Sequence, residues 1–202
     1  MEDVSAILVR LTEPSRTITL AATLTGLRRG ELFGLQWQDV DFVNNVIHVR
    51  RSLVDQVAGE PKTIGSKRPL PLNDELAKAL ALWKEQTPYA EPEDWAFASP
   101  ASRGEQPYWA NTIMAKHIQP AALDAEIAKT IGWHTFRRTF ATLLQSSGAT
   151  VKTTQELMRH STPAMTLGTY AQAVTADKRE AQDRIAAMIL PQTVTEIGTL
   201  NA

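Results

Sequence analysis

Histidine and arginine side chains recur at spacings that bring them together on folding. His134 and Arg137 are three residues apart in a stretch where Phe136 and Phe140 belong to an apolar stripe, which predicts a helix over 134–147. Positions i and i+3 lie on the same helical face. A titratable imidazole beside a permanently charged guanidinium is suited to holding a phosphate and moving a proton at it. A capping histidine and a surface arginine would have the same spacing, so this pair alone does not decide.

Another arginine stands between two predicted helices. The first of these helices, over 16–25, should stop at Gly26, and a short one should cover 30–35. Arg28 therefore lies where backbone N–H groups are left exposed at a helix junction, a setting that suits an anion. Arginines beside helix ends also serve purely structural purposes.

Two further segments carry chemistry-bearing side chains. Residues 61–68 form a basic, glycine-containing turn between predicted strands, in which Lys62 can reach toward a bound ligand. Further on, Arg159 and His160 precede Tyr170, which follows His160 by ten residues. Each segment also has an ordinary structural interpretation: the lysine is solvated, or the tyrosine is packed in the core. The order of all these residues along the chain is more informative than any one of them.

Taken in order, these segments resemble the catalytic domain of the tyrosine recombinase (phage integrase) family, which carries Arg, Lys, His-x-x-Arg, His and Tyr. The resemblance covers about residues 1–190 and implies these catalytic residues: Arg28, Lys62, His134, Arg137, His160 and Tyr170. Lys67, in the same predicted hairpin, is the alternative to Lys62. One position departs from the family, which usually has glycine before the later histidine, where this chain has Arg159. If the backbone there needs a positive φ, a non-glycine residue costs on the order of 1 kcal/mol.

The resemblance implies a covalent mechanism that conserves the energy of the phosphodiester bond. Tyr170 would attack the scissile phosphate to give a 3′-phosphotyrosine and a free 5′-hydroxyl, and attack by a 5′-hydroxyl would reverse the step without ATP. A tyrosine hydroxyl has an ordinary pKa near 10, and His134 is the best candidate to exchange its proton.

The other family positions would act on the phosphate itself. Arg28 and Arg137 would hold the non-bridging oxygens, His160 would add a hydrogen bond, and Lys62 would protonate the departing 5′-oxygen. No cofactor is expected. A metal is not expected either, because two arginines would supply the positive charge, the histidines lack ligand spacing and the chain has no cysteine.

Charge distribution bears on a DNA partner. The net charge is −1, but residues 1–70 and 131–202 carry +1 and +2 while residues 71–130 carry −4. Local basic clusters can meet phosphates even in a chain of low net charge. The residues predicted to bind double-stranded DNA outside the catalytic set are Arg29, Arg51, Lys67, Arg68 and Arg138.

The elements that must position these residues are mostly helices. Hydrophobic residues make up 43% of the chain and charged ones 21%, which is ordinary for a folded domain and unlike a disordered one. The predicted fold is mixed α and β, mainly α-helical with a small antiparallel β-sheet, as in the tyrosine recombinase catalytic fold. Helices are predicted over 4–11, 16–25, 30–35, 73–87, 108–117, 121–128, 134–147, 151–159 and 176–190, and strands over 46–54, 57–64 and 68–72.

The expected organisation is one catalytic domain over 1–190 and a C-terminal tail over 191–202 that docks on a neighbouring molecule. The N-terminal DNA-binding domain of the family is expected to be absent from this chain. The resemblance implies a site-specific recombinase of a mobile element, acting in DNA integration or excision as a synaptic tetramer on DNA. No stretch reaches the roughly 20 apolar residues of a membrane helix, so a cytoplasmic location is expected. Two alternatives stay open: a type IB topoisomerase-like enzyme that relaxes supercoils, and a non-catalytic DNA-binding remnant.

Overall fold

The computed structural model describes residues 2–60 and 69–159. Several predictions fall outside these ranges and stay predictions. They concern Lys62, Lys67, Arg68, His160 and Tyr170, the helix over 176–190 and the tail over 191–202.

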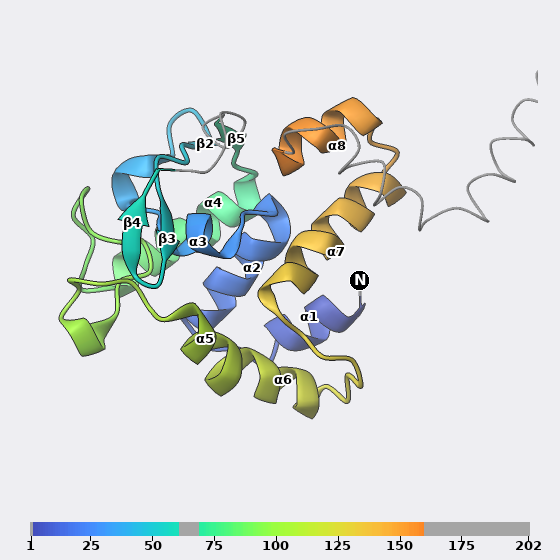
Figure 1. The fold of residues 1–202 in the computed structure, drawn as a ribbon, viewed down its shortest axis with the longest axis horizontal. Coiled ribbons are helices and arrows are strands. Elements are labelled where there is room, and N and C mark those ends of the chain that lie inside the picture. Colours follow the sequence, from blue (N-terminus) through green and yellow to red (C-terminus); the bar gives the residue numbers. More distant parts are fainter. Residues whose placement is uncertain (1, 61–68, 160–202) are drawn as a thin grey trace, which may run out of the picture.

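Helices make up most of the described chain (Figure 1). They are α1 (Glu2–Leu8), α2 (Ser15–Thr25), α3 (Arg29–Phe33), α4 (Asp74–Gln86), α5 (Ala110–Ile113), α6 (Gln119–Asp124), α7 (Trp133–Ser146) and α8 (Val151–Met158). Helix α2 runs through the middle and packs against α4 and α7. Its Ile18, Ala21 and Ala22 are buried, as expected of a helix covered on several sides. It stops at Gly26, as predicted, because that residue takes the left-handed conformation at φ +59°.

The strands form two small antiparallel sheets. One contains β1 (Val40–Asp41), β2 (Val46–Ile47) and β5 (Leu70–Pro71) in that order, and the other is the hairpin of β3 (Ser52–Val54) and β4 (Val57–Gly59). The mainly helical fold with small antiparallel sheets is confirmed.

The single strand predicted over 46–54 is wrong, because regular pairing breaks off between Ile47 and Ser52. His48 donates its backbone N–H to the carbonyl of Asp39 at 2.8 Å, and Arg51 donates to the Asp39 carboxylate at 2.6 Å. The backbone bond continues the pairing of β1 with β2 by one residue. The Arg51 side chain then pairs with Asp39, and the chain enters the second sheet at Ser52.

Residues 110–124 form one continuous helical run where two separate helices were predicted. Its middle part, Met114–Ile118, is a π-helix that joins α5 to α6. Pro120 follows directly, and proline lacks the N–H and clashes with the carbonyl four residues earlier in a regular α-helix. A π turn is one way to carry a helix past such a position. No helix in residues 2–60 and 69–159 is long and apolar enough to cross a membrane.

Candidate active site

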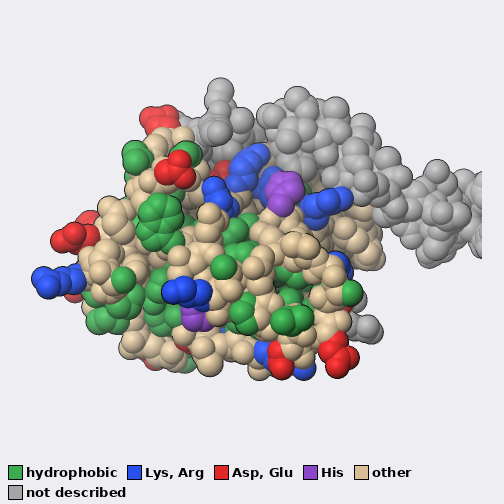
Figure 2. All heavy atoms as spheres, turned by 60° about the horizontal axis from the view of Figure 1, so that its bottom comes forward, with side chains coloured by type: hydrophobic (Ala, Val, Ile, Leu, Met, Phe, Trp, Pro, Cys, Tyr) green, Lys and Arg blue, Asp and Glu red, His purple; other side chains and the backbone are tan. Residues whose placement is uncertain are grey.

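The junction between α2 and α3 faces the first turn of α7 across a recess of about 410 Å³. Its described lining residues are Leu27, Arg28, Arg29, Trp133, His134 and Arg137. Figure 2 shows Lys and Arg side chains gathered around a histidine on one face. Three of the predicted catalytic residues, Arg28, His134 and Arg137, therefore lie around one cavity although the sequence separates the first from the others by more than a hundred positions.

Arg137 is the most rigidly held of the three. Only 6% of its surface is exposed, and its guanidinium donates to the carbonyl of Gly26 and, at 2.5 Å, to the carbonyl of Met158. These carbonyls belong to the ends of α2 and α8. Burial, and next the positive charge of Arg28, lower the pKa of Arg137 to about 10. It remains a cation at neutral pH, in a position that an anion would stabilise.

Glu31 holds Arg28 at the edge of the recess. Its carboxylate is 2% exposed and accepts the Arg28 backbone N–H at 2.8 Å and the Arg28 guanidinium at 2.9 Å. The Arg28 side chain itself is about one-third exposed. One buried acid thus fixes both the main chain and the side chain of an arginine that faces solvent.

Arg159 reaches the same carboxylate from the end of α8. It pairs with Glu31 Oε2 and is 2% exposed. Its backbone has φ +51° and ψ 43°, so the position does adopt the left-handed conformation usual for glycine. Burial lowers the pKa of the Arg159 guanidinium, and the Glu31 charge opposes that shift.

His134 lies on the first turn of α7 and is exposed to solvent. The turn is fixed on both sides of it. The Gly132 N–H donates to Thr135 Oγ1 at 3.1 Å, and the Trp133 indole donates to the Ala110 carbonyl at 3.1 Å and meets the Phe33 ring edge-on at 5.1 Å. An accessible imidazole on a rigid turn can exchange protons with a bound substrate.

The arginines predicted to bind DNA have different surroundings. Arg29 is exposed and borders the recess, and Arg138 is exposed but is not among the lining residues. Arg51 is mostly buried and pairs with Asp39 at 2.6 Å, which gives it a structural task. Contact of these residues with DNA stays a prediction.

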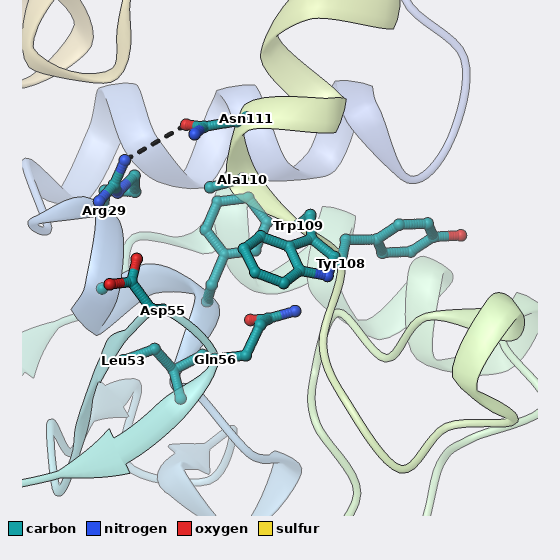
Figure 3. Close-up of a pocket in the computed structure, with 10 residues that line it drawn as sticks. Arg29, Leu53, Asp55, Gln56, Tyr108, Trp109, Ala110 and Asn111 are labelled. Carbon is teal, nitrogen blue, oxygen red and sulfur yellow. Dashed lines mark hydrogen bonds between the residues drawn. The ribbon is translucent and has the colours of Figure 1, made fainter.

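A second, smaller pocket adjoins the first through Arg29 (Figure 3). Arg29 Nη1 lies 3.3 Å from Asn111 Oδ1, and the ring of Trp109 lies beside the Tyr108 to Asn111 backbone with 55% of its surface exposed. Asp55 and Gln56 close the pocket from the turn between β3 and β4. Sequence reasoning missed this pocket, since Trp109 resembles any other apolar residue at the start of a helix.

Comparison with known proteins shows to which family the chain belongs. The profile of the phage integrase family matches residues 2–177. The chain belongs to the phage integrase family. This integrase-family chain is 27% identical over 191 residues to the "Tyrosine recombinase XerC-like" protein of Caldanaerobacter subterraneus subsp. tengcongensis, covering 84% of the chain and 48% of the relative. It is 30% identical over 178 residues to the "Prophage integrase IntR" of Escherichia coli, covering 77% and 42% respectively.

Solved structures agree with this assignment. The Tn1549 transposon integrase in complex with circular intermediate DNA superposes with a TM-score of 0.72 at 28% identity, over 92% of this chain and 64% of that one. This chain spans about half the length of the curated relatives it matches. The predicted family and fold are confirmed.

Sequence reasoning gave Glu31 no task and treated Arg159 only as a departure from the family. The signal for Glu31 was its i+3 spacing from Arg28, which is the spacing of a capping interaction. No local signal links Glu31 to Arg159, which lies 128 residues away. Among residues 2–60 and 69–159 there is no group of three or more His, Cys, Asp or Glu side chains that could hold a metal ion.

Proposed function

We propose that this chain cleaves and rejoins DNA strands in site-specific recombination, through a 3′-phosphotyrosine on Tyr170. The observation that carries the proposal is the recess in which Arg28 and Arg137 are fixed beside an exposed His134. Two guanidinium groups around one cavity suit the non-bridging oxygens of a phosphodiester, whose charge increases as the phosphorus becomes pentacoordinate. A guanidinium has five N–H donors, so carbonyls can anchor it while it still binds an anion.

In the proposed reaction the Tyr170 oxygen forms a bond to phosphorus and the bond from phosphorus to the 5′-oxygen breaks. His134 takes part in the transfer of the tyrosine proton, and Lys62 donates a proton to the departing 5′-oxygen. His160 hydrogen-bonds the same phosphate. The reverse reaction, with a 5′-hydroxyl from another strand, completes the exchange, so that no nucleotide cofactor is consumed.

The two adjoining pockets support a path for the DNA. Arg29 borders both, so a strand whose scissile phosphate lies between Arg28 and Arg137 continues past Arg29 toward the exposed Trp109. An arginine there can neutralise the next phosphate, and an exposed indole can pack against a sugar or a base. Arg138, Lys67 and Arg68 are proposed to add phosphate contacts around this path.

The proposed biological setting is a mobile element that integrates into or excises from DNA. Support comes from relatives named as a prophage integrase and a transposon integrase, the latter solved with circular intermediate DNA. Assembly into a tetramer on DNA, with the 191–202 tail docked on a neighbouring protomer, is part of the same proposal.

A trapped covalent adduct tests the chemistry. A duplex with a nick beside the cleavage position loses its short 5′-hydroxyl fragment after attack, so the phosphotyrosine accumulates and is seen on a denaturing gel. Because the target site is unknown, nicked duplexes from a library of candidate ends are screened with the wild-type chain. Tyr170→Phe should form no adduct, whereas Tyr89→Phe should react as the wild type does. An adduct that survives in Tyr170→Phe would refute the assignment.

A further inference from the structure

The residue at the end of α8 combines an unfavourable backbone with a buried charge. Arg159 has φ +51°, a conformation in which a side chain costs energy that glycine avoids. Its side chain is nevertheless nearly inaccessible, at 2% exposure. Arg103 has almost the same backbone, with φ +53° and ψ 33°, but its side chain lies in solvent. The chain thus contains an internal reference for an arginine in this conformation.

Glu31 connects Arg159 to Arg28. The Arg159 guanidinium and the Arg28 backbone N–H both bond to Oε2 of Glu31, and the Arg28 guanidinium bonds to Oε1. Arg159 thus fixes the Glu31 carboxylate from the end of α8, and the same carboxylate fixes the backbone of Arg28 at the start of α3. The carboxylate cannot rotate without breaking the Arg159 pair. The direction in which Arg28 faces the recess therefore depends on a residue that lies 128 positions from Glu31 in the sequence.

Among the described residues, positive charges outnumber negative ones around the recess. Arg28, Arg137 and Arg159 contribute three positive charges and Glu31 one negative charge, and the first two arginines line the cavity. The surroundings of Arg137 and Arg159 are largely buried, where charges are screened less than in water. The excess positive charge therefore raises the potential in the cavity, which favours an anion.

We propose that Arg159 is a positioning residue of the phosphate site: through Glu31 it sets the orientation of Arg28, and it adds its charge to the recess without touching the DNA. The inference rests on the proposed function for its substrate, a phosphodiester. It differs from a purely structural interpretation, in which Arg159 only closes the end of α8. Because Arg159 acts on one phosphate of a duplex that other contacts also hold, its loss should lower the rate of cleavage more than the affinity for DNA.

Three variants of the full chain test this: Arg159→Gly, Arg159→Lys and the matched control Arg103→Gly. Single-turnover cleavage of the nicked duplex is measured with saturating protein, and DNA affinity is measured separately. Arg159→Gly should cleave at least ten-fold more slowly with its DNA dissociation constant within two-fold of wild type. Arg159→Lys should recover part of the rate, because it keeps the charge but not the guanidinium fork. Arg103→Gly should behave as wild type.

Chemical rescue separates positioning from folding. Glycine at 159 leaves space where the guanidinium lay, so added methylguanidinium should raise the rate of Arg159→Gly and leave Arg103→Gly unchanged. A wild-type rate in Arg159→Gly would overturn the proposal. A loss of DNA affinity as large as the loss of rate would also overturn it. The same holds if Arg159→Gly and Arg159→Lys cleave at equal rates and have equally lowered melting temperatures.

A DNA-free measurement distinguishes failure of this inference from failure of the proposed function. Inorganic phosphate is titrated into each protein by calorimetry, with sulfate as a second anion. Arg159→Gly should bind phosphate about two-fold more weakly than wild type, in line with its small effect on DNA affinity, with Arg103→Gly unchanged. If no wild-type adduct forms on any duplex, the proposed function fails, and the phosphate titration still supports or overturns the role of Arg159. Unchanged phosphate affinity in Arg159→Gly would overturn it.

Discussion

Replacing Glu31 with glutamine should destabilise the fold more than the same replacement of an exposed glutamate would. Glutamine keeps the shape of the side chain but offers one oxygen in place of two, and its amide would face a guanidinium. The Arg159 pair is almost fully buried, and breaking one side of a buried pair costs about 3–5 kcal/mol. The Arg28 pair is one-third exposed, so it adds only about 1 kcal/mol or less.

We expect Glu31→Gln to lower the free energy of unfolding by about 3 kcal/mol. This is the lower end of the range for a broken buried pair, because the Gln oxygen still accepts one hydrogen bond. For a chain of this size, 1 kcal/mol corresponds to roughly 2–4 °C, so the melting temperature should fall by about 6–12 °C. Circular dichroism during thermal and urea unfolding at pH 7 measures both quantities.

Glu75→Gln is the matched control for this experiment. Glu75 also accepts from a basic residue three positions away, Lys78, at 2.9 Å, but both side chains are exposed. Surface pairs of this kind contribute about 0.5 kcal/mol, so the control should melt within about 2 °C of wild type. A Glu31→Gln variant that loses less than about 1 kcal/mol would refute the view that Glu31 joins two helices through buried charge.

Three other expectations can be measured on the same protein. Lys62→Ala should slow cleavage of an ordinary phosphodiester strongly but have much less effect when the bridging 5′-oxygen is sulfur, because a thiolate leaves without a proton; an equal defect on both substrates would transfer the role to Lys67 or another group. Gly26→Ala should lower the free energy of unfolding by about 2–4 kcal/mol in urea titrations, because a Cβ at φ +59° would lie 2.4 Å from Phe140 Cδ1. Gly148 has φ +80°, but no atom of the described residues lies within 4 Å of its Cβ position, so Gly148→Ala should cost only about 1 kcal/mol. Similar values for both variants would argue against the packing explanation. Labelled duplex, titrated at two salt concentrations, should bind in the micromolar range or weaker. The slope of log K against the logarithm of the salt concentration should be shallower than about −4, since each phosphate contact contributes about 0.9 to it; tight, sequence-specific binding would contradict this.

Local patterns were enough to place the helices that carry the site. The apolar stripe of Phe136 and Phe140 predicted α7 to within one residue at each end, and Gly26 predicted the end of α2. Both depend on side-chain periodicity and on the freedom of glycine to adopt positive φ, which are properties of a few adjacent residues.

Features that depend on distant partners were not predictable in this way. The strand over 46–54 has the alternation of a continuous strand, yet its first part pairs with β1 and β5 and its last part pairs with β4 in another sheet. The pair between Arg159 and Glu31 joins residues 128 positions apart, and nothing near either residue indicates it. The motif order predicted Arg28, His134 and Arg137 as catalytic residues, and the structure places all three around one recess. The link from that recess through Glu31 to Arg159 became evident only in the folded chain.

The two carbonyl contacts of Arg137 also govern when the recess comes into being during synthesis. Gly26 emerges from the ribosome early and Met158 late, and Arg137 bonds to the backbone of both. A nascent chain that has made α2 and α7 but not α8 contains Arg28 and Arg137 and lacks the second anchor that aligns Arg137. Arg137 is therefore fully anchored only after residue 158 has been added. Under the proposed function, a partly translated chain would lack the complete phosphate site and could not yet cleave DNA.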